Sequence, residues 1–456
     1  MKLQDACLNL PASMSSFLCS RTREILAWVA TSSAIPAFAL LGWAHAPAAL
    51  AEEAASTKSF YASSFSQMPS VAGLTTIGRA LFFDPSLSAS GRIACSGCHD
   101  PRFAYGPPPG LSLAGPGKQN RSHAGFRATP SLRYLQATPR FAEHRFDESG
   151  DESIDQGPSG GHMWDGRADT LHDQALLPLL SPSEMANKRP EDLVAKARRA
   201  TYAAQFRAVF GDDVFDSNER AFKAILLALE VFQQSPADFY PYSSRYDAWL
   251  RGRGRLSEQE LRGLAIFNDS RKGNCASCHP SQVRNGALPQ FTDYGYAALG
   301  VPRNAAIPAN ADPRFFDLGL CGPQRKDLSD HHEYCGMFKV PTLRNVAVRR
   351  EFFHNGKFSD LERSVQFYAK RDTAPERWYA RLRRTAATFD DLPPALQANV
   401  NRDPPFGRKR GEQSPISDEE IGDVIAFLRT LTDADISVPP MAATGTRETG
   451  HGSPIE

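Results

Sequence analysis

Two long stretches of this chain carry apolar and polar positions with the spacing of a helix. The first, Glu219 to Gln234, reads ERAFKAILLALEVFQQ, and the second, Asp418 to Leu431, reads DEEIGDVIAFLRTL. Apolar residues recur in both every three or four positions, the period of an amphipathic helix with one buried face. Ser417 and the acidic residues after it form a helix start, and Pro236 follows the first stretch. The pattern therefore predicts two amphipathic helices.

A weak internal repeat precedes each of these helices. The stretch Ile77 to His99, IGRALFFDPSLSASGRIACSGCH, resembles Leu261 to His279, LRGLAIFNDSRKGNCASCH. Each copy begins with a short helical segment that has Gly and Phe at matching offsets and ends in Asp. A turn that contains Gly then leads to the same closing pattern, C-x-x-C-H. The repeat predicts two halves of similar construction.

Breaks in the pattern set the expected organisation. The residues from Tyr240 to Arg255 contain Pro, serines and the string RGRGR, so a domain boundary is expected there. Three further segments rich in Gly, Pro, Ser and Asp are predicted to be loops: 107–117, 148–161 and 304–312. The predicted parts are a leader (1–51), an N-terminal domain (60–242), a C-terminal domain (243–438) and a disordered tail (439–456).

The first fifty residues have the features of an export signal. Arg21 and Arg23 precede an apolar stretch from Ile25 to Leu41, and Ala49-Leu50-Ala51 offers small residues for cleavage before Glu52. An uncleaved membrane anchor is the alternative. Pro36 and two serines interrupt the apolar run, which favours cleavage and therefore a periplasmic protein with no membrane span.

The overall composition is that of a folded chain with two packed domains. Its 456 residues carry 52 Lys and Arg against 51 Asp and Glu, and 10% of them are aromatic. The near-neutral balance argues against a nucleic-acid partner, because such a partner requires a basic surface.

The two C-x-x-C-H strings carry the strongest chemical signal. Their reactive groups are Cys95, Cys98 and His99 in the first copy and Cys275, Cys278 and His279 in the second. This spacing is the attachment signature of a c-type haem: two thiols add to the vinyl groups of one porphyrin, and the adjacent imidazole ligates the iron. Structural zinc is the alternative, but zinc does not require a His directly after the second Cys. Two covalently bound haems are therefore expected, on a mainly α fold of two cytochrome c-like haem domains packed together with long loops.

The remaining cysteines fit an oxidising compartment. Cys7 and Cys19 lie in the leader, which leaves only Cys321 and Cys335 after haem attachment. A disulfide between these two is predicted, with two buried thiols as the alternative.

Three blocks of sequence extend the haem signal to a family. They are GRALFFDPSLSASGRIACSGCHDP, HMWDGRADTLHDQALLPLLSPSEM and YCGMFKVPTLRNVAVRREFFHNGKFSDLERSVQFY. On these blocks the chain resembles the bacterial di-haem cytochrome c peroxidases, including their MauG-like branch, from about Gly78 to Thr432. The resemblance implies a peroxide-reducing oxidoreductase whose N-terminal haem is the peroxide site.

The resemblance assigns roles around the first haem. His99 would be the proximal iron ligand, Glu184 the distal acid–base group, and Gln174 and Pro178 would line the pocket. A carboxylate over the iron can move a proton from one peroxide oxygen to the other, so that the outer oxygen leaves as water. From the residues alone, Glu184 could instead be a charge in the first turn of a helix that Ser181 or Ser183 caps.

Two aromatic residues would serve the second haem and the path between the haems. Trp164, in a WDGR string, would relay charge between the haems, with a buried core Trp as the alternative. His279 would be the proximal ligand of the C-terminal iron, and Tyr368, fourteen residues after His354, its sixth ligand. A phenolate is a hard, anionic donor that lowers the potential and favours ferric or higher states. An ordinary helix aromatic is the alternative for Tyr368, and Met337 is a weaker ligand candidate.

The chain departs from the family pattern at two places. The family's calcium site uses an Asn in an R-N-x-P string, whereas this chain has Arg127-Ala128-Thr129-Pro130. The nearby Thr and Pro positions are Arg349 and Glu351, so calcium is doubtful, although Glu351 could supply an oxygen ligand. His123 is the nearest candidate for a cap on the resting N-terminal iron, but its position does not fit, and an open iron is expected. Extra residues between Arg140 and Gly161 have no assigned role.

The sequence as a whole predicts an exported di-haem c-type peroxidase. Hydrogen peroxide would be reduced at the N-terminal haem, with electrons arriving through the C-terminal haem from a small periplasmic c-type cytochrome or copper protein. A MauG-like oxidase that modifies side chains of a partner protein is one alternative. A non-catalytic di-haem electron carrier is another.

Overall fold

The computed structural model describes residues 65–111, 125–146, 155–379 and 388–437. The predicted leader, the predicted tail and His123 lie outside these residues. Within them the secondary structure is mostly helical. The helices are α2 (Val71–Phe82), α3 (Cys95–Cys98), α4 (Leu171–Leu180), α5 (Pro190–Arg199), α6 (Ala203–Phe210), α7 (Asn218–Gln233), α8 (Pro236–Phe239), α9 (Arg245–Leu250), α10 (Glu258–Asn268), α11 (Leu361–Lys370) and α12 (Asp418–Arg429). The strands β1 (Tyr296–Ala297) and β2 (Phe338–Lys339) pair antiparallel.

Both amphipathic helices predicted from the sequence are present. Helix α7 covers the first stretch and α12 the second. At the start of α12, the Ser417 hydroxyl accepts a hydrogen bond from the Glu420 amide, and the Glu420 carboxylate accepts one from the Ser417 amide. This reciprocal capping satisfies two amides that have no partner inside the helix. The predicted boundary region near 240–255, in contrast, contains α9, which the interrupted pattern concealed.

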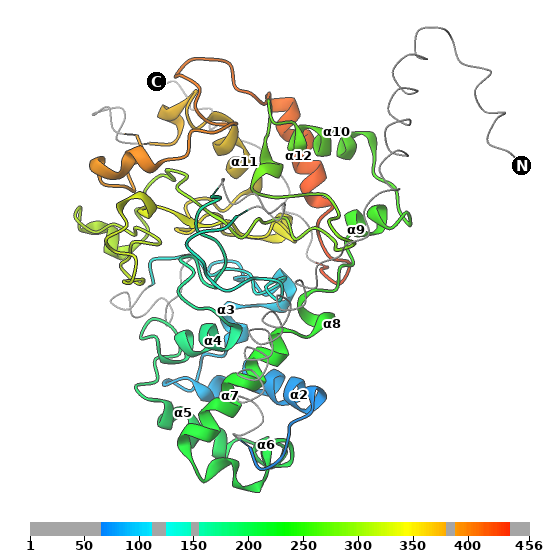
Figure 1. Ribbon diagram of the computed structural model, residues 1–456, viewed down its shortest axis with the longest axis vertical. Helices are drawn as coiled ribbons and strands as arrows, with labels where there is room; N and C mark the ends of the chain where they lie inside the picture. The colour runs from blue at the N-terminus through cyan, green and yellow to red at the C-terminus, as the bar shows by residue number, and fades with distance from the viewer. Residues whose placement is uncertain (1–64, 112–124, 147–154, 380–387, 438–456) are drawn as a thin grey trace, which may run out of the picture. The chain divides into compact units, whose positions relative to one another are not determined.

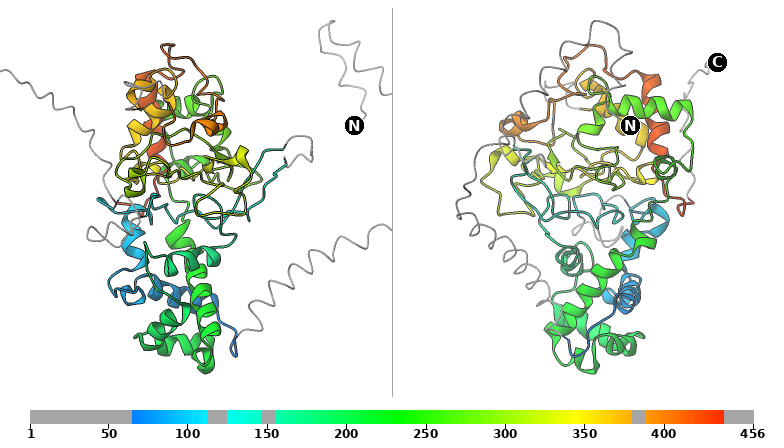
Figure 2. Two further views of the ribbon diagram at one scale, coloured as in Figure 1. Left: turned by 90° about the vertical axis from the view of Figure 1, so that its left-hand side faces the viewer. Right: turned by 45° about the vertical axis from the view of Figure 1, so that its right-hand side comes forward.

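The repeat seen in the sequence corresponds to two helix pairs. Helix α2 packs against α7, and α10 packs against α12 (Figures 1 and 2). At each crossing the repeat supplies a glycine. A Cβ on Gly78 would lie 1.9 Å from the carbonyl oxygen of Ala228, and one on Gly263 would lie 2.0 Å from that of Asp423. No other residue type allows the backbones to approach so closely.

Each helix pair contains the same aromatic trio. In the N-terminal half, Phe82 of α2 contacts Phe232 of α7 and Tyr105, with ring centroids 5.4 and 5.7 Å apart. In the C-terminal half, the corresponding rings are Phe267 of α10, Phe427 of α12 and Phe291, at 5.2 and 6.2 Å. Edge-to-face aromatic contacts of this kind add to the free energy gained by burial. The two halves are therefore built on one plan.

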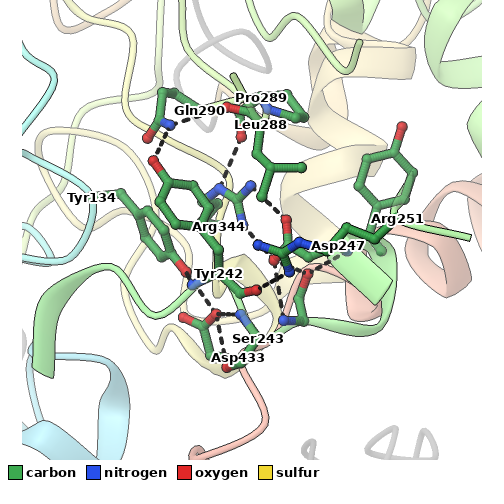
Figure 3. Close-up of polar contacts among 12 residues, drawn as sticks. Tyr134, Tyr242, Ser243, Asp247, Arg251, Leu288, Pro289, Gln290, Arg344 and Asp433 are labelled. Carbon is green, nitrogen blue, oxygen red and sulfur yellow. Dashed lines mark hydrogen bonds and ion pairs between the residues drawn. The ribbon is translucent and has the colours of Figure 1, made fainter. Parts of the chain in front are cut away.

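A polar cluster joins residues from the two halves (Figure 3). The guanidinium of Arg344 lies 4.6 and 4.7 Å from the rings of Tyr134 and Tyr242 and forms two hydrogen bonds, each 2.9 Å long, to Asp247. The Tyr134 hydroxyl donates to Asp433 at 2.6 Å. Because Tyr134 precedes the predicted boundary and Asp433 follows α12, the cluster ties distant parts of the chain together.

Two further features concern the loops. Cys321 and Cys335 form a disulfide, as predicted. Of the predicted loop segments, 304–312 contains the short 3-10 turn Pro308–Ala311, and the other two lie partly outside the described residues.

None of the helices in the described part of the chain is long and apolar enough to cross a bilayer.

Candidate functional site: a cavity lined by both C-x-x-C-H motifs

A cavity of about 1470 Å³, partly open to solvent, is lined by both cysteine motifs. Sites for one small molecule usually have volumes of roughly 300–1,000 Å³, so this cavity has room for more than one large group. The residues on its wall include all six motif groups: Cys95, Cys98, His99, Cys275, Cys278 and His279. Most of the wall is apolar, as expected for a site that holds a porphyrin.

The two motif histidines are held in the same way at Nδ1. Nδ1 of His99 donates to the carbonyl oxygen of Tyr105 at 3.1 Å, and Nδ1 of His279 donates to that of Phe291 at 2.8 Å. Burial lowers the pKa of each imidazole to about 4, against the opposing effect of these carbonyls. Each ring is therefore neutral at pH 7, with Nε2 left as a lone-pair donor. A carbonyl on Nδ1 is the arrangement that orients an imidazole for iron.

The four motif thiols are free, and their environment fits thioether formation better than zinc binding. Burial raises the pKa of Cys95 and of Cys275 to about 12 and that of Cys98 to about 11. Zinc requires thiolates, which burial disfavours here. No group of three or more His, Cys, Asp and Glu side chains within the described residues is arranged to hold a metal ion. The cavity, the thiols and the oriented imidazoles together fit two covalently attached haems.

Glu184 lies in this cavity on the side of the first motif. It occupies a turn after α4, where its amide donates to the Ser181 carbonyl at 3.0 Å. Burial raises the pKa of Glu184, whereas a hydrogen bond from Ser181 and the charge of Arg167 act to lower it. The Glu184 charge in turn contributes to the raised pKa of Cys98. No helix begins at this turn, so the alternative of a charge in a capped first turn is wrong.

Helix α4 places two more predicted residues on the cavity wall. Gln174 is buried within the helix, and Pro178 lies one turn further along. Thr170 starts the helix by accepting a hydrogen bond from the amide of Asp173. The sequence-predicted set of Glu184, Gln174 and Pro178 is therefore brought to one wall of the cavity.

Trp164 lies on the wall between residues of the two halves. Its indole Nε1 donates to the carbonyl of Ala128 at 2.8 Å, and its own carbonyl accepts from the amide of Lys339. The adjacent Asp165 is fully buried and is held by Arg127 and Arg167 at 2.6 and 2.7 Å. This buried ion cluster fixes the turn that carries Trp164.

Tyr368 lines the cavity on the side of the second motif. It is on α11, and its ring stacks on those of Phe353 and Phe406 at 5.8 and 5.6 Å. Burial raises the pKa of its phenol, and the charges of Cys278 and Cys275 raise it further, so the ring is close to that motif. Met337 is not among the residues on the cavity wall.

The comparisons with known proteins identify the family. Residues 73–255 match the family described as di-haem cytochrome c peroxidase. Over 383 residues, 80% of this chain and 90% of the relative, the chain is 33% identical to the methylamine utilization protein MauG of Paracoccus denitrificans. It belongs to the di-haem cytochrome c peroxidase family, in its MauG-like branch. As a member, the chain is an oxidoreductase, and the family implies two c-type haems.

Further relatives of this di-haem peroxidase agree in fold and in name. The cytochrome c551 peroxidase of Nitrosomonas europaea is 28% identical over 306 residues, which cover 65% of this chain and 73% of the relative. The crystal structure of the diheme peroxidase BthA from Burkholderia thailandensis superposes with a TM-score of 0.70 at 39% identity, covering 79% of this chain and 86% of that one. These relatives are named as enzymes, which argues against the non-catalytic carrier.

The site of this di-haem peroxidase also contains residues that the sequence did not single out. The carbonyls of Tyr105 and Phe291 orient the proximal imidazoles. The only sequence signal for this role is that each of these two residues follows a C-x-x-C-H motif. Lys339 lies on the cavity wall; it belongs to the third family block, but no role is predicted for it from the sequence.

Two residues of the proposed calcium region also line the cavity. Burial raises the pKa of Glu351 to about 8, and its Oε2 is buried without a hydrogen-bond partner. Arg349 lies on the same wall. Ala128 has no side-chain oxygen, and its carbonyl is taken by Trp164. Calcium occupancy therefore stays a matter of expectation.

Proposed function

We propose that this protein reduces hydrogen peroxide to water at a haem carried by Cys95, Cys98 and His99. The observation that carries the proposal is Glu184, a buried carboxyl in the shared cavity beside the first motif. Cys275, Cys278, His279 and Tyr368 would hold the second haem, which would supply the route for electrons from a small periplasmic donor protein. The export signal predicted from residues 1–51 supports this compartment.

The residues supply proton transfer in this scheme. Cys95, Cys98 and His99 would hold the N-terminal haem, and its iron would supply the redox chemistry. The Glu184 carboxylate takes the proton of the inner peroxide oxygen and returns it to the outer one, which leaves as water. Gln174 holds the peroxide by hydrogen bonding, and Pro178 restricts the space around it. The overall balance is one peroxide, two protons and two electrons to two waters.

Trp164 and Tyr368 have different roles in the proposed cycle: Trp164 passes electrons between the haems, and Tyr368 stabilises the oxidised second haem. Trp164 is fixed by its indole hydrogen bond and by the buried Asp165 cluster, so it can pass single electrons with little rearrangement. A Tyr368 oxygen on the second iron favours its higher oxidation states. The enzyme is therefore expected to hold both oxidising equivalents of peroxide without an added reductant.

One titration tests the proposal. The diferric holoprotein is mixed with one equivalent of peroxide and followed optically into the near infrared. We expect a long-lived two-electron-oxidised state, and we expect Tyr368→Met to shorten its lifetime at least tenfold while raising the potential of the C-terminal haem. No reaction until one haem has been reduced would instead indicate a conventional cytochrome c peroxidase. No reaction even then would contradict peroxide chemistry.

A second candidate function is oxidation of side chains on a partner protein. It is favoured by the similarity to MauG over 90% of that protein's length and by the position of Tyr368. Turnover separates the two candidates. Rapid consumption of reduced cytochrome c with peroxide supports the peroxidase, whereas poor cytochrome turnover together with oxidation of a co-expressed partner protein supports the side-chain oxidase.

A further inference from the structure

Two cations on the wall of the haem cavity have no acidic partner among the described residues. The other buried arginines there, Arg127 and Arg167, are both paired with Asp165. Arg349 and Lys339 form no ion pair with any described carboxylate, and burial is the only influence that shifts the pKa of either. The two cations differ from the rest of the cavity wall in this respect.

Arg349 lies on the side of the second motif. Its Nη2 donates to the carbonyls of Thr342 and Arg344 at 2.7 and 3.2 Å, and its Nε is buried with no hydrogen-bond partner. Its charge contributes to the lowered pKa of His279, which places the guanidinium close to the proximal imidazole. Burial lowers the pKa of Arg349 only to about 10, so it keeps its charge at pH 7.

Lys339 lies next to Trp164. Its Nζ donates to the carbonyls of Gly160 and Gly161 and is 5.8 Å from the centroid of the Tyr294 ring. Burial lowers its pKa to about 7. Neighbouring His162 has a pKa lowered to about 3 by burial and by the Lys339 charge, so the imidazole is neutral and supplies no counter-charge.

Acidic groups on the same wall do not compensate these cations. Glu351 is kept largely protonated at pH 7 because burial raises its pKa to about 8. The carboxylate of Asp293 lies 4.0 Å from Arg145. A buried charge without a partner costs several kcal/mol, so such groups are kept where a ligand supplies the opposite charge. The group implied in this cavity, haem, carries two carboxylates on each porphyrin.

We propose that Arg349 and Lys339 bind haem propionates. Arg349 holds a propionate of the C-terminal haem through its unpaired Nε and its guanidinium face, and Lys339 holds one that reaches the Trp164 segment. The inference rests on the two haems of the proposed function. It adds the residues that neutralise the porphyrin acids and thereby set the haem potentials.

The test is the midpoint potential of each haem, measured by spectroelectrochemistry between pH 5 and 8 in Arg349→Met. Removing the cation leaves the propionate charge uncompensated, which favours the ferric state. We expect the potential of the C-terminal haem at pH 8 to fall by about 59 mV, a tenfold change in the ferric-to-ferrous ratio. Without its cation the propionate also becomes easier to protonate, so the difference from wild type should disappear toward pH 5.

Controls separate pairing from general charge and from folding. Arg349→Lys should restore most of the potential, and Lys326→Met, which removes an exposed cation at the rim of the same cavity, should change neither haem. Lys339→Met gives an independent reading if Arg349→Met does not accumulate. A paired propionate would keep Lys339 charged above its pKa of about 7, so this variant should lower the potential of one haem at pH 8 in the same manner.

Mass spectrometry of each variant shows first whether two haems are attached. Absence of haem in the wild type overturns the proposed function itself, and this inference with it. If both haems are present and the potentials of Arg349→Met and Lys339→Met equal those of the wild type at pH 8, only the propionate assignment is overturned. A fall in potential that persists unchanged to pH 5 also contradicts it, because a bare charge effect does not depend on propionate protonation.

Discussion

Glu184 owes its properties to the place where α4 ends. The turn after the helix carries the carboxyl into a cavity with few polar groups, and burial raises its pKa, while Ser181 and Arg167 counteract that rise. An acid with a raised pKa is better matched to proton transfer near neutral pH than an exposed one. The same side chain on the protein surface would be fully ionised and of little use as a shuttle.

A substitution and a pH profile test the role of Glu184. Glu184→Gln removes the proton acceptor and should slow the peroxide reaction by roughly 10²–10⁴-fold. In the wild type the carboxylate is the active form, so the rate should fall as the pH drops through a pKa above the usual 4.5. Stopped-flow absorbance of the diferric protein measures both effects. Glu191→Gln, an exposed carboxyl in the first turn of α5, is the matched control, and equal rates for the two variants would exclude Glu184 as the shuttle.

Residues whose chemistry is local could be predicted from the sequence, and those that act through distant contacts could not. The haem motifs can be recognised because two thioethers and one imidazole on a single porphyrin require a fixed spacing. Glu184 and Tyr368 became candidates only through resemblance, since an isolated Glu or Tyr has many roles. Lys339 gave no signal of its own and Arg349 stood out only as a departure from the family's calcium positions, because the absence of an acidic neighbour shows only in the folded chain.

The two helix pairs explain why each repeat copy has a Gly at the same offset, which the sequence alone does not. Gly78 and Gly263 occur at the same place in the two repeat copies, and each lies where one helix backbone meets the next. The aromatic trios were not predictable, because Tyr105 and Phe291 lie outside the recognised repeat. Helix α9 was not predicted because it has only 6 residues, and the Pro, Ser and Gly residues on either side of it are typical of loops.

Gly263→Ala tests the close contact between α10 and α12. The new methyl group would meet the carbonyl of Asp423, so the helices must separate, at a cost of roughly 1–3 kcal/mol in unfolding free energy. Gly422, in α12, has open space around it, and Gly422→Ala should be neutral or stabilise by about 0.5–1 kcal/mol through helix propensity. Denaturant unfolding followed by circular dichroism measures both. Similar effects for the two variants would show that the crossing tolerates a side chain.

For the molecule as a whole, a buried acid after the last helix holds the two halves together. Asp433 accepts hydrogen bonds from Tyr134 at 2.6 Å and Asn345 at 2.7 Å, and it forms an ion pair with Arg133 at 2.9 Å. Its side chain is fully buried, whereas that of Asp435, which pairs with the same arginine, is 48% exposed. Burial decides how much each pair contributes, since exposed pairs are screened by water.

Asp433→Ala is predicted to destabilise the whole protein. It leaves Tyr134 and Asn345 without their acceptor and the buried guanidinium of Arg133 with only the half-exposed Asp435, which costs roughly 3–5 kcal/mol. Asp435→Ala removes a carboxylate from the same arginine but should cost only about 0–1 kcal/mol, because that group is half exposed. The difference in denaturant midpoint between these variants is the measurement. Equal midpoints would mean that the cluster does not hold the halves together.

The distance along the chain between Arg133 and Asp433 has a consequence for biosynthesis. Their contact joins positions 300 residues apart, so it forms only after nearly the whole polypeptide has been delivered. Until then Arg133 lacks its fully buried partner, and the parts of the chain that this contact joins are not held together by it. A chain truncated before Asp433 is therefore expected to lack this contact and to be cleaved by protease faster than the full-length chain.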